Sequence, residues 1–124
     1  MYLGDALEID GHRHAQCGVL PYTTRMPARL TLAYVEITTT GGLLGAGHRA
    51  RGHVYHHSEI VQEPTLDRVY EIRTVQGETR AEGYSAGNVL ASYAHLHFGS
   101  SPRVPAAIVA QAQRWSELGV SGKT

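Results

Sequence analysis

Two histidines two residues apart, His95 and His97, have the residue type and spacing that most clearly suggest chemistry in this chain. They lie in a largely apolar and aromatic stretch from Asn88 to Phe98, which is typical of a strand. In a strand both imidazoles would share one face, and Leu96 and Phe98 would point to the other. Because imidazole transfers protons near neutral pH and also binds metals, the stretch predicts a site without defining its reaction.

A metal site is one alternative use of these histidines. The chain has eight histidines, and His53, His56 or His57 could complete a metal shell that the His-x-His pair begins. No acidic residue stands at a characteristic spacing to either group, and Cys17 is the only cysteine. A histidine-based metal-binding module therefore stays an alternative, and no metal ligand is assigned. The remaining histidines lie in predicted turns and are expected to be solvated: His12, His14 and His48.

Composition limits the classes of protein to which the chain can belong. Its 124 residues suffice for one domain with a hydrophobic core. The 11 basic and 11 acidic residues balance, so nothing favours nucleic acid or a membrane as a partner. A single cysteine excludes an intrachain disulfide, and neither a signal peptide nor an apolar run of membrane-spanning length is present. We expect a cytoplasmic protein.

The first half of the chain is predicted to hold one short helix, two strands and a loop. Residues 1–9 have the spacing of an amphipathic helix that ends at an Asp-Gly turn signal. Residues 17–20 resemble a short buried strand, and alternation over 29–39 predicts a longer one. The glycine-rich run 41–52 is expected to be a loop.

The second half is predicted to hold three strands and a final helix. The strands are expected over 53–60, 68–75 and 89–97, with turns at Gly77 and over 83–88. The helix would begin after a Ser-Pro pair, in which serine caps and proline suits the first turn. Together, the predicted strands and helices indicate a layered α/β or α+β arrangement. The apolar stripe of the helix would be formed by Val104, Ile108, Ala112 and Trp115, before Gly119 ends it.

Three runs, in order along the chain, carry a family resemblance. GVLPYTTRM spans 18–26, ARGHVYHHSEI spans 50–60, and ASYAHLHF spans 91–98. Together they resemble the C-terminal part of the glutamine amidotransferase domain of cobyrinic acid a,c-diamide synthases. The resemblance implies an α/β fold of the class I glutamine amidotransferase-like, flavodoxin-like kind, with a layered sheet and flanking helices. Residues 1–120 would form a partial domain and 121–124 a tail.

The same resemblance assigns roles to individual residues. His95 matches the catalytic histidine, the base for a cysteine thiolate that releases ammonia from glutamine. His97 stands where related amidotransferases with a full triad have a carboxylate, so the motif lacks that third member. The residues expected to line the active site are His97, His53, His56 and Tyr93. Tyr93 would share the face of the His-x-His pair. Each of these residues also has a purely structural interpretation as a packed or hydrogen-bonded strand side chain.

The chain departs from the family pattern at several positions. The family's cysteine lies in a run like ECGGLMYLG, and this chain begins with MYLG, just after that cysteine. Cys17 is not followed by the glycines of a nucleophile elbow. Val54 replaces a common glutamate, and His57 replaces a common tyrosine. We therefore expect a fragment, natural or cloned, that is inactive alone.

The resemblance also implies substrates and partners for the longer enzyme. Glutamine and a corrin would be its substrates, with ATP and Mg²⁺ bound by a preceding domain and no cofactor held by this chain. A non-catalytic interaction subunit is the other alternative. Missing leading strands would leave an unpaired sheet edge, which favours an N-terminal partner polypeptide or a homo-oligomer.

Overall fold

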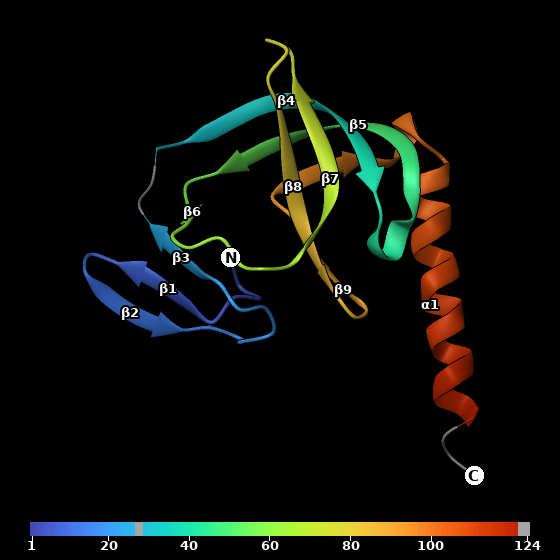
Figure 1. The fold of residues 1–124 in the computed structure, drawn as a ribbon, viewed down its shortest axis with the longest axis horizontal. Coiled ribbons are helices and arrows are strands. Elements are labelled where there is room, and N and C mark those ends of the chain that lie inside the picture. The colour runs from blue at the N-terminus through green and yellow to red at the C-terminus, as the bar shows by residue number, and fades with distance from the viewer. Residues whose placement is uncertain (27–28, 122–124) are drawn as a thin grey trace.

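A computed structural model describes residues 1–26 and 29–121 of the protein. These residues form two β-sheets and one long C-terminal α-helix (Figure 1). The larger sheet occupies the middle of the molecule, the smaller sheet lies at the N-terminal side, and the helix lies on the opposite side. The mixed α/β class expected from the sequence is confirmed at this level.

The larger sheet is antiparallel throughout, with the strand order β10-β5-β4-β7-β8-β9. Its two longest strands form the β4–β5 hairpin, which turns through the 3-10 helix η1 (Gly42–Leu44). Antiparallel neighbours that follow one another in sequence need only short connections, and this sheet uses several. The strands are β4 (Thr31–Thr40), β5 (Ala46–His56), β7 (Asp67–Thr74), β8 (Thr79–Ala86), β9 (Val89–Ala91) and β10 (Ala94–His97).

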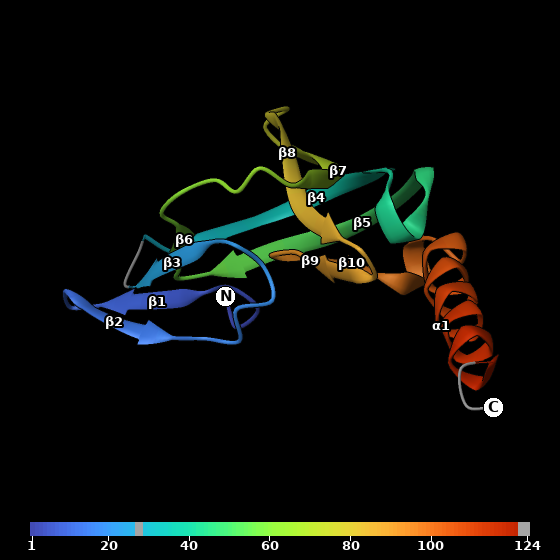
Figure 2. The same ribbon diagram turned by 60° about the horizontal axis from the view of Figure 1, so that its bottom comes forward.

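β9 and β10 stand at opposite ends of this strand order, although only Ser92 and Tyr93 separate them in sequence. Because the three Cα–Cα steps from Ala91 to Ala94 span at most about 11 Å, the facing ends of the two strands lie close together. The sheet must therefore curve until its two ends meet at Ser92 and Tyr93, which we call the closing bend. Figure 2 shows β9 and β10 following one another below β5.

The smaller sheet has the order β2-β1-β3-β6, in which β1 and β3 are parallel and the other pairs antiparallel. Asp10 and Gly11 connect β1 to β2 and both have positive φ, 48° and 78°. A two-residue hairpin turn of this kind suits an Asp-Gly pair. The predicted helix over 1–9 is wrong, because this turn pairs the segment as a strand. The strands are β1 (Ala6–Ile9), β2 (His12–Ala15), β3 (Thr23–Met26) and β6 (Glu59–Ile60).

Two hydrophobic clusters hold these elements together. The larger cluster lies on the concealed face of the main sheet and includes Ile37, Val54 and Ile72, with Val104 of the helix. Fully burying each such side chain contributes about 1.5–3 kcal/mol. The smaller cluster, Leu20, Tyr22 and Tyr84, joins the N-terminal segment to β8.

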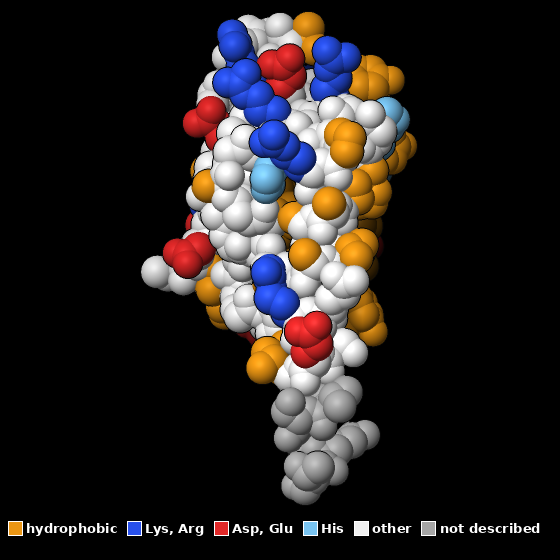
Figure 3. Space-filling view, turned by 90° about the vertical axis from the view of Figure 1, so that its right-hand side faces the viewer, with side chains coloured by type: hydrophobic (Ala, Val, Ile, Leu, Met, Phe, Trp, Pro, Cys, Tyr) orange, Lys and Arg blue, Asp and Glu red, His pale blue; other side chains and the backbone are white. Residues whose placement is uncertain are grey.

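The predicted C-terminal helix is confirmed as α1 (Arg103–Ser121), but its predicted end is wrong, because the helix continues through Gly119 to Ser121. Val104 is fully buried, and the Gln111 side chain donates a 2.7 Å hydrogen bond to the carbonyl of Leu43. The rest of the predicted apolar stripe is mostly uncovered, since Ile108 and Trp115 are exposed. The second half of the helix extends past the sheet in Figure 1, and hydrophobic side chains run along one flank of this side in Figure 3.

The long strands predicted over 29–39 and 68–75 are confirmed as β4 and β7. The strand predicted over 89–97 is present but interrupted by the closing bend. The strand predicted over 53–60 is divided between the end of β5 and β6.

Three other predictions are wrong. Residues 17–20 form no strand, and Cys17 is exposed. Most of the predicted glycine-rich loop belongs to β5, and the predicted turn over 83–88 belongs largely to β8. Gly83 sits inside β8 with φ +70°, where a Cβ would lie 2.7 Å from Val69 Cγ2. Glycine there allows close packing within the sheet rather than a turn.

No helix among the described residues is both long and apolar enough to span a membrane. The predicted tail begins at Ser121, which ends α1, and its other residues lie outside the described part of the chain.

Candidate active site

The second and third motifs meet in the larger sheet, because β10 pairs antiparallel with β5. His95 lies directly opposite His53, and their rings stack with centroids 4.7 Å apart and planes 4° from parallel. Both side chains are exposed. The structure thus brings together two of the residues predicted to form the site, although 42 positions separate them in sequence.

The two faces of β10 are as the sequence predicts. His95 and His97 lie on the exposed face, while Ala94 and Leu96 are half-buried on the other. Phe98 does not continue this alternation, because the strand ends at His97 and Phe98 begins the 3-10 turn η2 (Phe98–Ser100).

Gly52 permits the close approach of β10 to β5. A Cβ at this position would lie 2.2 Å from the carbonyl oxygen of His95 and 2.8 Å from Ile37 Cδ1. Contacts this short do not occur in folded proteins, so the site geometry requires glycine before His53.

The exposed face around the stacked pair is open and partly aromatic. Tyr34 on β4 lies opposite His53 on its other side and is 76% exposed. His97 lies opposite Arg51, which in turn faces Glu36. A groove of about 510 Å³ on this face is lined by Tyr34 and Arg51 among others. The stacked imidazoles are therefore accessible to a substrate or to a covering segment.

His56 and Tyr93 form a separate cluster, on the side of β5 away from the stacked pair. Their rings stack with centroids 3.9 Å apart. The Nδ1 of His56 donates to the carbonyl of Ser58 (2.7 Å), and Ser58 Oγ shares a 2.6 Å hydrogen bond with the Tyr93 hydroxyl. Burial lowers the pKa of His56 and raises the pKa of Tyr93. This pair is half-buried, packed and hydrogen-bonded.

Tyr93 was expected to share the face of the His-x-His pair and to lie near an imidazole of that pair. It contacts His56 instead, because Tyr93 belongs to the closing bend and precedes β10. The alternation of a strand does not extend through such a bend.

Glu82, on β8, is a member of this cluster that the sequence does not reveal. Its carboxylate accepts hydrogen bonds from Ser92 Oγ (2.6 Å) and from the backbone N–H of Tyr93 (2.9 Å), and the residue is only 8% exposed. No spacing to the histidine motifs marks Glu82, because its contacts depend on the β8–β9 register.

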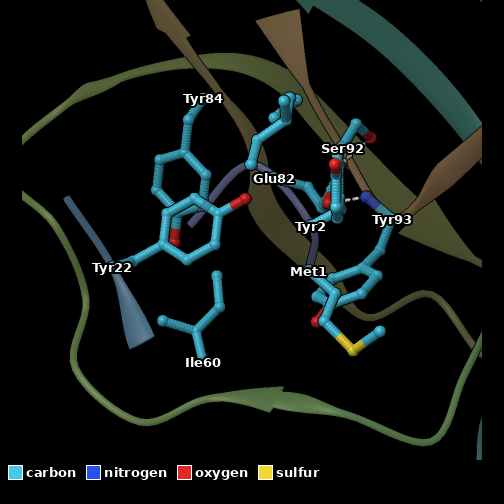
Figure 4. A pocket seen from close by; sticks show the side chains of 10 residues that line it. Met1, Tyr2, Tyr22, Ile60, Glu82, Tyr84, Ser92 and Tyr93 are labelled. Atoms are coloured by element: carbon cyan, nitrogen blue, oxygen red, sulfur yellow. Dashed lines mark hydrogen bonds between the residues drawn. The ribbon is translucent and has the colours of Figure 1, made fainter. Parts of the chain in front are cut away.

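A cavity of about 210 Å³ lies beside this cluster and brings the first motif to the third. Tyr22, from the first motif, and Tyr93 both line it, as do Glu82 and Tyr84 (Figure 4). The rings of Tyr22 and Tyr84 lie 5.7 Å apart. Residues Met1 and Tyr2 also line the cavity, so the first residues of the chain lie close to the closing bend.

The other histidines take no part in either cluster. His12 and His14 are exposed as expected, but they lie in β2 rather than in a turn. His48 lies in β5 with a buried Nδ1 that has no hydrogen-bond partner among the described residues, so the expectation of full solvation is wrong. In the described part of the chain, no group of three or more His, Cys, Asp or Glu side chains is placed to hold a metal ion.

Comparison with known proteins decides the family. The family of CobB/CobQ-like glutamine amidotransferase domains matches residues 1–103. The chain belongs to this family. The resemblance carried by the three motifs is thereby confirmed.

Two curated relatives of the chain are cobyrinate a,c-diamide synthases. The cobyrinate a,c-diamide synthase of Syntrophotalea carbinolica is 40% identical over 117 residues, which cover 88% of this chain and 26% of that protein. The cobyrinate a,c-diamide synthase of Thermoplasma acidophilum is 37% identical over 107 residues, which cover 84% of this chain and 24% of that protein. The chain thus spans about a quarter of the length of these relatives.

The two departures from the family motif have different surroundings. Val54 is fully buried and packs in the main core, so an apolar side chain suits its position. His57 is exposed and lies edge-on to Tyr55, with ring centroids 5.9 Å apart. A glutamate at position 54 would put a carboxylate into this core, where it would need hydrogen-bonding partners.

Proposed function

We propose that this chain supplies the histidine-bearing part of a glutamine amidotransferase site in a cobyrinate a,c-diamide synthase. Membership of the glutamine amidotransferase family and the shared name of the relatives support the proposal. The observation that carries it is the pairing of His95 with His53 on an exposed sheet face.

In this proposal His95 is the base for a cysteine that another part of the enzyme provides. The thiol proton moves to the imidazole, and the sulfur attacks the side-chain carboxamide carbon of glutamine. The imidazolium then gives its proton to the leaving nitrogen, which departs as ammonia and leaves a glutamyl thioester. Water hydrolyses the thioester with the same imidazole as base, so that glutamate is released and the thiol is restored.

The remaining steps would take place elsewhere in the longer enzyme. The ammonia would amidate acetate side chains of a corrin whose carboxylates are activated by ATP, and ATP and Mg²⁺ would be held by another domain. The sheets described here would join further strands in a flavodoxin-like layered domain, either within one polypeptide or with a partner polypeptide. His97 and His53 would border the site, whereas His56 and Tyr93, which were also expected to line it, lie on the other side of β5.

A chimera tests the proposal directly. Residues 1–103 would replace the matching segment of the Syntrophotalea carbinolica enzyme, and ammonia release from glutamine would be measured. We expect an active chimera that loses about 10²- to 10⁴-fold in rate with His95→Ala, the usual contribution of a general base. His57→Ala, an exposed histidine beyond the stacked pair, is the matched control and should change the rate little.

Two results would contradict the proposal. A chimera without glutaminase activity would show that this segment cannot supply a working site, and an unchanged rate with His95→Ala would remove His95 as the base. The isolated chain should release no ammonia, because its only cysteine, Cys17, lies outside a nucleophile motif.

A further inference from the structure

The carboxylate of Glu82 is a buried charge without a cationic partner. The residue is 8% exposed, and no Lys, Arg or His among the described residues forms an ion pair with it. Burying an unpaired carboxylate is costly unless hydrogen bonds compensate it. Glu82 has two such bonds, and both come from the closing bend, Ser92 and Tyr93.

These bonds form where the backbone ladder between β8 and β9 ends. Tyr84 pairs with Ala91, so Tyr93 falls opposite Glu82 in the same register. The N–H of Tyr93 is bonded to the Glu82 side chain. Ser92 Oγ, which donates to the carboxylate, also accepts a 2.8 Å hydrogen bond from the N–H of Ala94, the first residue of β10. A chain of hydrogen bonds therefore leads from Glu82 to the residue before His95.

The closing bend is also held from β5. Tyr93 stacks on His56 and shares a hydrogen bond with Ser58, both next to the end of that strand. Glu82 and the His56–Ser58 pair thus hold the bend from two sides of the curved sheet. Glu82 contacts the bend and not the imidazole of His95, so it can act on His95 only through the backbone.

We propose that Glu82 is a positioning residue for His95, which rests on the proposed function of His95 as the base. By fixing Ser92 and Tyr93, the carboxylate sets where β10 begins and so holds His95 opposite His53. Without the Glu82 carboxylate the closing bend is no longer fixed, so β10 can shift. A displacement of about 1 Å at a catalytic group can reduce the rate roughly 100-fold.

The first test concerns geometry and uses the full 124-residue chain. NMR cross-peaks between the ring protons of His53 and His95 report the stacked pair, and those between Tyr22 and Tyr84 report the fold. Glu82→Ala should remove the first set and keep the second. Glu82→Gln should keep both, because an amide can accept from the Tyr93 N–H and still hydrogen-bond to Ser92 Oγ. Glu71→Ala, an exposed glutamate on neighbouring β7, is the matched control and should keep both.

The second test concerns rate and uses the chimera. Glu82→Ala should lower kcat about 10- to 100-fold with KM for glutamine changed less than about 2-fold, and Glu82→Gln should restore kcat to within about 3-fold. A folded Glu82→Ala protein that keeps the His53–His95 cross-peaks would overturn the proposal.

If Glu82→Ala does not fold, the Ser92→Ala variant tests the proposal instead. It removes only the hydroxyl that links Glu82 to β10. Weakened cross-peaks between His53 and His95 in that variant would support the proposal, and unchanged ones would overturn it. Because the NMR result needs no glutaminase activity, it separates failure of this inference from failure of His95 as the base.

Discussion

The imidazole rings of His53 and His95 lie face to face, with centroids 4.7 Å apart and planes 4° from parallel. The two residues are direct partners in the β5–β10 pairing. Gly52, next to His53, allows this pairing, because it leaves room for the carbonyl of His95. The stacked pair therefore depends on a residue that has no side chain of its own.

Gly52→Ala should destabilise the protein. The added Cβ would meet the His95 carbonyl oxygen at 2.2 Å, so β10 must move away, and overpacking of this kind costs roughly 1–3 kcal/mol. Urea denaturation gives the free energy of unfolding. Gly119→Ala, a helical glycine with nothing within 4 Å of the new Cβ, is the control and should raise that free energy by up to about 1 kcal/mol. Equal effects of the two changes would contradict the close approach.

Acid should weaken the fold through His56. Burial holds the pKa of His56 below its ordinary value, so the unfolded chain binds a proton more readily than the folded one. The free energy of unfolding must then fall as the pH drops below about 6.5 and toward the folded pKa. His56→Asn keeps a donor for the Ser58 carbonyl and has no titrating ring. Between pH 7.5 and 5.5, the wild type should lose more stability than His56→Asn in urea denaturation. Equal losses in the two proteins would show that His56 does not contribute to the pH dependence.

Tyr70→Phe should stabilise the protein. The Tyr70 hydroxyl is buried and has no hydrogen-bond partner among the described residues, so its removal should gain about 1 kcal/mol. Burial also raises the pKa of Tyr70 to about 12, so wild type loses stability as the pH rises above about 10, and the gain in the variant should grow there.

Thermal or urea unfolding at pH 8 and at pH 10.5 would measure both effects. Tyr93→Phe is the opposite case, because it removes the hydroxyl that bonds Ser58, and it should cost about 1 kcal/mol at pH 8. A loss of stability with Tyr70→Phe would mean that its hydroxyl is satisfied after all.

Gln111→Ala should loosen α1 from the sheet. The Gln111 amide is hydrogen-bonded to the carbonyl of Leu43 in η1, and losing this bond should cost about 1 kcal/mol. Amide hydrogen exchange within α1 should become faster, while exchange in β4 should not change. Gln113→Ala, on the exposed side of the same helix, should leave exchange unaltered.

The elements that the sequence predicts correctly are those with a strong local pattern. β4 and β7 are rich in β-branched and aromatic residues, and α1 follows a Ser-Pro start with helical spacing, so local chemistry alone suffices. β1 and β8 were missed because their structure depends on the strands that pair with them. β1 pairs with β2 through the local Asp10-Gly11 turn, but it is also held by the more distant β3, and Gly83 fits inside β8 because Val69 lies beneath it.

The candidate site likewise has a part that the sequence predicts and a part that it does not. The motifs place His95 and His97 on one strand face and single out His53 and His56, because residue type and order along the chain carry that information. They cannot show that His53 stacks on His95 while His56 stacks on Tyr93, since each contact depends on strand register across the curved sheet.

The closing bend has a consequence for the order in which the chain folds. The β4–β5 and β7–β8 hairpins join neighbouring segments and can form early, whereas residue 95 must find residue 53 across 42 positions. Closure of the sheet is thus expected late, after the folding transition state. Changes at the bend should then accelerate unfolding more than they slow refolding, and the histidine pair would assemble after both hairpins.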